Sequence, residues 1–147
     1  MSPQLAWITG AGGLIGAQII RAAPGAWTAR GLTRGELDLS DFAAVSEAFA
    51  RERPKLVIHC AALSKPPACQ ENPALARRVN VEVTAQLARL AAEIPFVFFS
   101  SDLVFDGQRG NYDEAATPNP LSIYAETKIA AEQIVLVNPR HTVIRTS

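Results

Sequence analysis

Two continuous apolar runs place the strongest constraint on the fold: KLVIHCAA at residues 55–62 and IPFVFFSS at residues 94–101. Neither run alternates polar and apolar residues, and both are too short for an ordinary helix. Strands that are covered on both faces have this pattern, and such strands occur in parallel sheets. The two runs therefore predict a parallel sheet with helices on both of its faces.

The rest of the chain supplies further strands and the helices that connect them. Strands are expected at residues 5–9, 26–33 and 141–147, and helices at residues 14–22, 41–51, 79–92 and 124–137. Ser40 is the expected N-cap of the second helix, and residues 106–120, rich in Gly, Asn and Pro, are expected to form a loop. Alternating strands and helices imply right-handed crossovers. The prediction is one doubly wound, three-layer α/β/α domain of the Rossmann type over residues 1–147.

Composition narrows the range of functions. Hydrophobic residues make up 48% of the chain and charged residues 19%, which is typical of a globular protein. Fourteen basic residues balance fourteen acidic ones, so no general attraction to nucleic acid or to an anionic membrane is expected. No segment approaches the ~20 apolar residues of a membrane helix, and no secretory signal is visible.

The cysteines and histidines form no metal-binding pattern. Cys60 and Cys69 are expected to be free thiols in a reducing, cytoplasmic compartment, although a single disulfide is an alternative. His59 and His141 are isolated in the sequence and are expected to be structural. The sequence therefore predicts no metal site.

Three glycines separate the first strand from the first helix. Gly10, Gly13 and Gly16 form a G-x-x-G-x-x-G pattern, with Leu14 and Ile15 inside it. Glycine permits a tight turn and lets the backbone approach a pyrophosphate, which the N–H groups of the following helix can bind. The alternative is a turn whose glycines serve packing alone. The position after a strand and before a helix favours dinucleotide binding.

The segment after the second strand bears on the choice of cofactor. Thr33 and Arg34 stand where an acidic residue would hold the ribose diol of NAD. A guanidinium group suits a phosphate dianion, so NADP(H) is preferred and NAD(H) is the alternative. Arg34 could instead be a solvated surface residue. Asp38 and Leu39 are expected beside the adenine.

Three side chains are candidates for the chemistry. Tyr124 and Lys128 are four residues apart near a helix start, hence on one face. Nearby positive charge would lower the tyrosine pKa from about 10, and the phenol could protonate a carbonyl oxygen as hydride reaches its carbon. Ser101 ends a strand at the carboxyl edge of the sheet and could orient that carbonyl. Taken singly, these residues fit a half-exposed helix face and a capping serine equally well.

A series of motifs runs in order through nearly the whole chain: TGAGGLIG, ELDLSD, VIHCAA, VNVEVT, SSDLVFDG, PNPLSIYAETK and VIRTS. With these motifs the chain resembles the extended short-chain dehydrogenase/reductases. Within them it is most similar to the dTDP-4-dehydrorhamnose reductase group. SSDLVFDG and NPLSIYAETK are the most specific parts of the resemblance.

The resemblance implies a role for each candidate residue. Ser101 would hold the substrate carbonyl, Tyr124 would be the acid, and Lys128 would grip the nicotinamide ribose and tune Tyr124. The glycines would form the pyrophosphate turn, and Ala61 and Ala62 would line the cofactor. Asn80 would reach the cofactor region, or would be a buried amide that satisfies loop backbone.

The implied activity is NADPH-dependent reduction of the 4-keto group of a nucleotide-linked 6-deoxy sugar, in or near dTDP-rhamnose biosynthesis. Ala125, Glu126 and Leu103 depart from the family pattern, as does LSKPPACQENP in the loop expected beside the substrate. Family members are about twice as long because a C-terminal lobe, absent from this chain, binds the substrate nucleotide. The chain is therefore expected to bind NADP(H) and to turn over substrate poorly.

The sequence leaves two alternative functions and one oligomeric state to be considered. The same scaffold serves nucleotide-sugar epimerases and dehydratases, and the regulatory subunit of methionine adenosyltransferase is similar too. The resemblance also suggests a homodimer through helices 79–92 and 124–137. Their outer faces are expected to hold alanine and leucine, such as Ala85, Leu87, Ala88 and Ala131, although packing within the core explains some of these side chains equally well.

Overall fold

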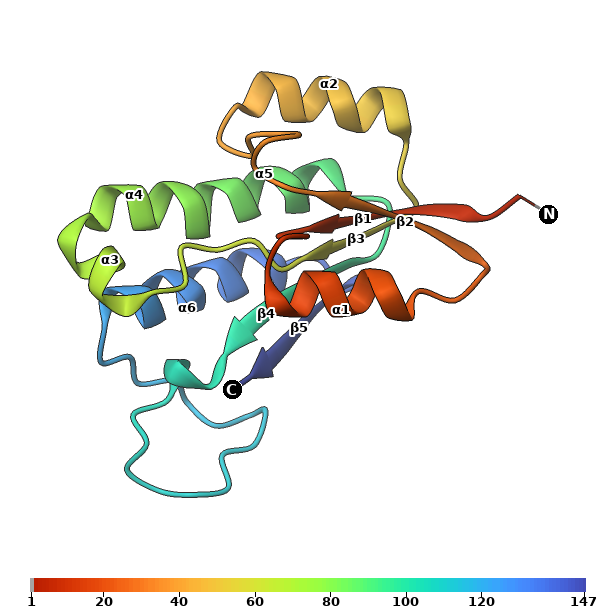
Figure 1. Ribbon diagram of the computed structural model, residues 1–147. Coiled ribbons are helices and arrows are strands. Elements are labelled where there is room, and N and C mark those ends of the chain that lie inside the picture. Colours follow the sequence, from red (N-terminus) through yellow and green to blue (C-terminus); the bar gives the residue numbers. More distant parts are fainter. Residues whose placement is uncertain (1) are drawn as a thin grey trace.

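A computed structural model describes residues 2–147 and contains one sheet of five parallel strands in the order β2-β1-β3-β4-β5 (Figure 1). The strands are β1 (Gln4–Thr9), β2 (Trp27–Leu32), β3 (Leu56–His59), β4 (Phe96–Ser101) and β5 (His141–Thr146). The chain starts at β1, winds outward to β2, and then crosses back to wind outward through β3, β4 and β5. The predicted doubly wound α/β fold is confirmed.

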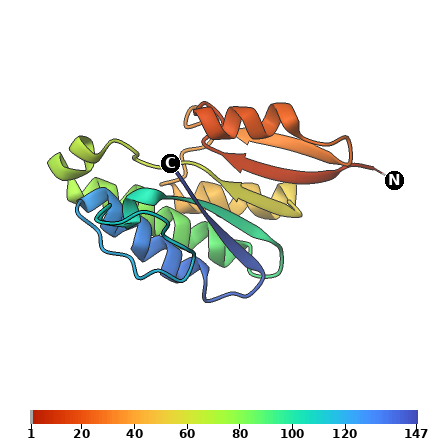
Figure 2. The same cartoon turned by 90° about the horizontal axis from the view of Figure 1, so that it is seen from below.

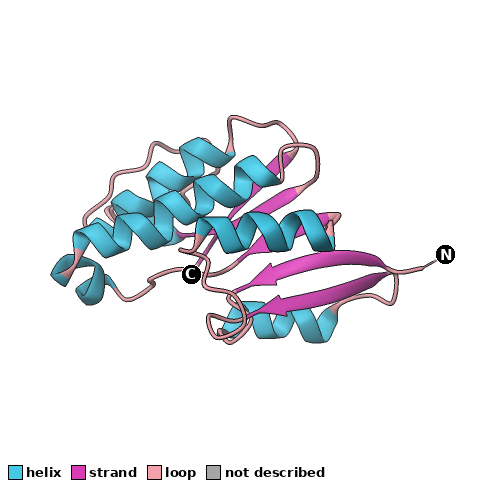
Figure 3. Ribbon diagram, turned by 90° about the horizontal axis from the view of Figure 1, so that it is seen from above, coloured by secondary structure: helices cyan, strands magenta, loops and turns pink. Residues whose placement is uncertain are grey.

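Helices cover both faces of the sheet unequally. The helices are α1 (Leu14–Ala22), α2 (Phe42–Glu52), α3 (Pro66–Glu71), α4 (Pro73–Arg77), α5 (Val83–Leu90) and α6 (Ile123–Val135). A π-helical turn, η1 (Arg78–Glu82), joins α4 to α5, and a 3-10 turn, η2 (Asp102–Val104), follows β4. Figures 2 and 3 show α1 on one face and α2, α5 and α6 on the other.

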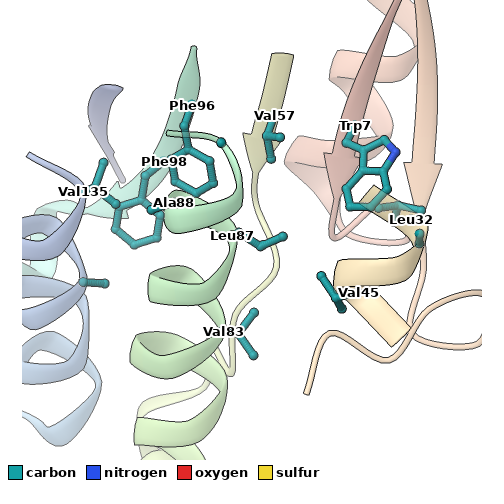
Figure 4. Packing of buried hydrophobic residues seen from close by; sticks show 13 residues of the cluster. Trp7, Leu32, Val45, Val57, Val83, Leu87, Ala88, Phe96, Phe98 and Val135 are labelled. Carbon is teal, nitrogen blue, oxygen red and sulfur yellow. The ribbon is translucent and has the colours of Figure 1, made fainter. Parts of the chain in front are cut away.

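The main core lies between the sheet and the layer of three helices. Figure 4 shows Phe96 and Phe98 of β4 beside Leu87 of α5, all of them buried. At the other side of the same cluster, the Trp7 ring meets Phe49 edge-on, with 5.3 Å between the ring centroids. Trp7, Phe96 and Phe98 come from strands with few polar residues, as expected of strands that are covered on both faces.

Two local predictions about helix and strand ends are wrong. The run 55–62 is a strand only over Leu56–His59, so Ala61 and Ala62 lie in the loop beyond β3. The N-cap of α2 is Asp41, whose carboxylate accepts a hydrogen bond from the Ala44 N–H at 3.0 Å. The Ser40 hydroxyl and N–H both donate to the Asp38 carboxylate instead.

The helix predicted at 79–92 begins earlier, as the continuous run α4, η1 and α5. The prediction missed α3 and α4, which lie in the proline-rich segment after β3. Pro66 and Pro73 each stand at the first turn of a helix, where the missing N–H of proline costs no hydrogen bond. The Asn72 carboxamide caps α4 by accepting from the Leu75 N–H at 3.0 Å.

Of the two explanations for the apolar residues of the helix pair, burial favours packing within the core. Leu87, Ala88 and Ala131 are buried in the chain's own core, while Ala85 is half-buried. Burial of these three side chains is explained by packing within the chain. Within residues 2–147, no helix combines the length and the apolar character needed to cross a membrane.

Candidate active site

A cleft of about 760 Å³ lies at the carboxyl ends of β1, β3 and β4, where open α/β sheets bind ligands. It collects nearly all the residues that the sequence singled out. Those lining it are Gly10, Gly13, Leu14, Ile15, Gly16, Thr33, Arg34, Asp38, Leu39, Ala61, Ala62, Ser101, Tyr124 and Lys128. Asn80 lies outside the lining.

The glycine turn is packed too tightly for larger residues. Gly10 has a positive φ of 68°, and a Cβ there would lie 2.7 Å from the Ala61 nitrogen. A Cβ at Gly16 would overlap the carbonyl oxygen of Gly10. Gly12, in contrast, faces open space. The packing explanation for the glycines therefore holds at Gly10 and Gly16.

The same turn leaves the start of α1 open toward the cleft. Gly13 is the N-cap and offers no side chain, so Leu14, Ile15 and Gly16 begin the helix without a side-chain cap. N–H groups in the first turn of a helix have no partner within it and carry partial positive charge. An anionic group in the cleft would find these donors ready. The turn thus suits both packing and phosphate binding.

At the far end of the cleft, Arg34 and Asp38 belong to the lining and Glu36 does not. The Glu36 carboxylate accepts from the N–H and hydroxyl of Thr33, at 3.0 and 2.8 Å, and is absent from the cleft lining. These hydrogen bonds lower the pKa of Glu36. Arg34 is exposed and lines the cleft. Asp38 also lines it, with its carboxylate bonded to Ser40.

The sequence analysis missed a second arginine at this end. Arg78, from η1, lines the cleft and donates to the Ser40 carbonyl and to the Glu82 carboxylate, both at 2.8 Å. Its guanidinium lies 4.0 Å from the centroid of the Phe42 ring. No sequence pattern could have placed it there, because Ser40 and Arg78 are joined only through the tertiary fold.

At the opposite end, Ser101, Tyr124 and Lys128 come together from β4 and α6. Their residues are 8%, 8% and 3% exposed, respectively. The Ser122 hydroxyl caps α6 by accepting from the Ala125 N–H at 3.2 Å, which places Tyr124 in the first turn. The Ser101 hydroxyl accepts from the Leu103 N–H at 3.2 Å. Two segments far apart in the chain thus form one polar cluster at the edge of the sheet.

The protonation of this cluster differs from the expectation. Burial raises the pKa of the Tyr124 phenol, and the Ser101 hydroxyl acts in the opposite direction. The expected lowering by Lys128 is not found, because its ammonium donates to the Phe99 carbonyl at 2.7 Å and lies 4.1 Å from the Phe98 ring centroid. Burial lowers the pKa of Lys128 to about 8. Tyr124 is therefore a protonated phenol at neutral pH.

A chain of buried hydrogen bonds supports the floor of the cleft. The Thr9 hydroxyl accepts from the N–H groups of Cys60 and Ala61, at 3.1 and 3.2 Å, so its own proton goes to Nδ1 of His59 at 2.6 Å. Nε2 then donates to the Thr84 hydroxyl at 3.0 Å. Burial lowers the pKa of His59 to about 3, which fits this neutral ring. His59 is thus structural, as expected.

Asn80 holds the wall of the cleft without reaching into it. Its side-chain amide accepts from the Leu63 N–H at 2.8 Å and donates to the Leu63 carbonyl and the Thr127 hydroxyl, at 3.1 and 3.0 Å. Leu63 itself lines the cleft. All polar groups of the amide are therefore used in fixing the loop after β3 against α6, which favours the structural reading of this residue.

Both cysteines are free, but Cys69 has a place that the sequence did not suggest. It is fully buried in α3, in a small cluster with Ala76 and Tyr124. The missed helix α3 therefore packs behind the candidate acid. Within the described part of the chain, no group of three His, Cys, Asp or Glu side chains is arranged to hold a metal ion.

Together the fold and the cleft define a class of protein. A parallel doubly wound sheet, a glycine turn that opens a helix, and a Ser-Tyr-Lys cluster across the same cleft are the features of the short-chain dehydrogenase/reductase class. The model of the family described as RmlD substrate binding domain matches residues 6–147, and the chain belongs to this family.

Similar proteins agree with this assignment. The chain is 38% identical over 141 residues to dTDP-4-dehydrorhamnose reductase of Streptomyces griseus, covering 91% of this chain and 46% of the relative. It is 37% identical over 143 residues to methionine adenosyltransferase 2 subunit beta of Xenopus laevis, covering 90% and 43%. The chain spans about half the length of these relatives.

A solved structure matches over the whole chain. The dTDP-4-dehydrorhamnose reductase of Bacillus anthracis, solved in complex with NADP, superposes with a TM-score of 0.94 at 30% identity. The match covers 100% of this chain and 54% of that one. The family resemblance read from the sequence is thereby confirmed, as is its relation to oxidoreductases that act on nucleotide sugars.

Proposed function

We propose that this chain is the cofactor-binding domain, residues 1–147, of an NADPH-dependent reductase that acts on the 4-keto group of a nucleotide-linked 6-deoxy sugar. One observation carries the proposal: a single cleft joins the glycine turn and open helix start of α1 to Ser101, Tyr124 and Lys128. Relatives that carry the reductase name lie at 38% and 30% identity.

The residues of the chain fit a nicotinamide dinucleotide along the cleft. Gly10, Gly13 and Gly16 and the N–H groups at the start of α1 would hold the pyrophosphate. Ala61 and Ala62 would line its path, and the Lys128 ammonium would donate to the ribose hydroxyls. Asp38 and Leu39 would flank the adenine, with Thr33 beside its ribose.

NADP(H) is preferred over NAD(H) in this proposal. Arg34 and Arg78 both line the end of the cleft that lies beyond β2, and Glu36 is held away from it by Thr33 and Arg30. Two guanidinium groups favour a phosphate on the ribose, whereas a carboxylate would favour a free diol. The cofactor in the Bacillus anthracis relative is NADP as well.

When bound, the cofactor supplies hydride to the carbonyl carbon. The Ser101 hydroxyl donates a hydrogen bond that orients the carbonyl oxygen, and the Tyr124 phenol transfers its proton to that oxygen. Because burial raises the pKa of Tyr124, the proton-bearing form needed for reduction is the resting form.

The test is NADPH consumption by the protein that carries this chain, with a dTDP-linked 4-keto-6-deoxy sugar as substrate. Tyr124→Phe should lower kcat roughly 100-fold or more while NADPH still binds. Tyr112→Phe is the matched control, since Tyr112 is the other of the two tyrosines and lies outside the cleft lining. Equal turnover by wild type and Tyr124→Phe would refute the proposed role of Tyr124.

A second candidate is an NADP-binding regulatory subunit, which the 37% identity to methionine adenosyltransferase 2 subunit beta favours. It would retain cofactor binding and have no reductase activity. Co-purification with a methionine adenosyltransferase catalytic subunit, together with absent turnover, would support it. An epimerase or dehydratase would instead retain tightly bound NAD through purification.

A further inference from the structure

A buried ion pair lies directly behind the Ser-Tyr-Lys cluster. Nε and Nη2 of Arg145, in β5, donate to the two carboxylate oxygens of Glu132, in α6, at 3.0 and 2.7 Å. The side chains are 21% and 4% exposed, respectively. The proposed reaction gives this pair no role, although Arg145 belongs to the VIRTS motif.

Glu132 lies on the same stripe of α6 as the candidate catalytic residues. Tyr124, Lys128 and Glu132 follow one another at intervals of four, so a lysine and a carboxylate are neighbours one helical turn apart. Lys128 nevertheless makes no ion pair within residues 2–147. Its ammonium donates to the Phe99 carbonyl, on β4 and in the cleft lining. Both oxygens that could attract it are bonded to Arg145 instead.

We propose that Arg145 is a positioning residue: by holding both oxygens of Glu132, it keeps the Lys128 ammonium turned toward the cleft. The cofactor-binding consequence of this arrangement rests on the proposed function, whereas the arrangement of the three side chains does not. Without Arg145, the buried carboxylate would lose its two charged donors, which is costly. Lys128, one helical turn away on α6, is a cation that could replace them.

Among residues 2–147, Glu132 is the carboxylate that acts on Lys128. From β3 and the loop after it come His59, which is neutral, and the Cys60 thiol, whose pKa burial raises to about 11. On its own helix lie Tyr124 and Glu132. Glu132 raises the pKa of Lys128 against the larger effect of burial, so the two side chains interact even while Arg145 holds the carboxylate.

Arg145 is itself fixed in orientation. Its guanidinium lies 5.0 Å from the centroid of the Phe105 ring, which stacks on Tyr112 at 4.4 Å between centroids. The Tyr112 hydroxyl donates to Asp106, which is also bonded to Asn119. A planar guanidinium held in this way presents two parallel N–H donors to the two oxygens of one carboxylate, whereas a lysine ammonium acts as a compact point charge.

The test is ¹³C NMR titration of the lysine side chains in this chain, which has three lysines, Lys55, Lys65 and Lys128. Arg145→Met should raise the apparent pKa of Lys128 by about one unit, because Glu132 then pairs with it. Lys55 and Lys65 should not move and serve as internal controls. NADPH affinity, measured by fluorescence, should fall about tenfold.

The double variant Glu132→Gln/Arg145→Met distinguishes positioning from a purely structural role. With no carboxylate to capture Lys128, its pKa should return to the wild-type value or below, and NADPH affinity should recover. Arg145→Lys, which can cover one carboxylate oxygen, should give an intermediate rise and also serves if Arg145→Met does not fold. No rise in either single variant, or no return in the double variant, overturns the proposal. The expected pKa pattern without NADPH binding by wild type would instead refute the proposed function alone.

Discussion

The two ends of the cleft are built in different ways. At the α1 end the surface is backbone: Gly10 and Gly16 leave no room for a side chain, and the helix start offers N–H groups. At the α6 end the surface is made of the side chains of Ser101, Tyr124 and Lys128, each at least nine-tenths buried. The α1 end depends on the absence of side chains at its glycines, and the α6 end depends on the functional groups of its side chains.

Because of this difference, substitutions at the two ends should affect different properties of the protein. A substitution at the glycine end adds atoms where backbone already lies, so its first effect should be on folding. A substitution at the side-chain end removes a buried polar group, so its first effect should be on binding or turnover. The predictions below test this separation, beginning with the largest effect.

Gly10→Ala should lower the free energy of unfolding by about 3 kcal/mol, since it combines strained backbone with overpacking. The positive φ and the contact with the Ala61 nitrogen cause both penalties. Urea denaturation followed by circular dichroism measures the loss. Gly12→Ala, in the same turn but facing open space, is the matched control and should change stability by less than about 0.5 kcal/mol. Equal losses would contradict the packing argument.

The buried His59 is bonded to Thr9 and Thr84 beneath the cleft, and it should make the protein sensitive to acid. Its pKa is about 3 in the folded chain and about 6.5 when unfolded, so between these values only the unfolded state takes up the proton. The contribution of His59 to the free energy of unfolding should therefore be fully present above pH 6.5 and fall as the pH drops. At pH 5 the loss from this group should be about 2 kcal/mol.

Denaturation curves at pH 7 and pH 5 for wild type and His59→Gln measure that contribution. The variant should be less stable at pH 7 because it loses ring contacts with Phe96 and Phe98. Its loss between the two pH values should be smaller by about 2 kcal/mol. The same pH dependence in both proteins would mean that His59 is not the responsible group.

Lys128→Met should separate binding from stability at the side-chain end. NADPH affinity should fall about tenfold, or about 1.4 kcal/mol, with the loss of the ammonium donor. The free energy of unfolding should stay within about 1 kcal/mol of wild type, because a buried charge is exchanged for an apolar chain of similar length. Fluorescence titration and urea denaturation measure the two quantities. A large loss of stability would show that this end also serves folding.

Arg34→Ala should have the smallest effect and should discriminate between cofactors. NADPH affinity should fall by about 1 kcal/mol, roughly fivefold, while NADH affinity should change little. Arg89→Ala, an exposed arginine on α5 outside the cleft lining, is the control. Equal losses for both cofactors would place Arg34 away from the ribose phosphate.

The sequence by itself determined the class of fold and the glycine end of the cleft. Strands that are buried on both faces must be apolar throughout, so the runs at β3 and β4 are visible in the local sequence. The alternation of strands and helices is visible in the same way. The contact of Gly16 with the Gly10 carbonyl is likewise local, whereas the contact of Gly10 with Ala61 depends on the pairing of β1 with β3. The spacing of Tyr124 and Lys128 also follows from one helix.

The tertiary structure alone decided how the other end works. It packs Cys69 of the missed helix α3 against Tyr124, and it turns Lys128 to the Phe99 carbonyl while Arg145 holds Glu132. At the end that holds Arg34, it likewise brings Arg78 to Ser40. It also ties Asn80 to Leu63 instead of directing it into the cleft. Each of these contacts joins segments that are separate in the chain. Their partners, burial and pKa values depend on the packing of those segments, which no local pattern of residues records.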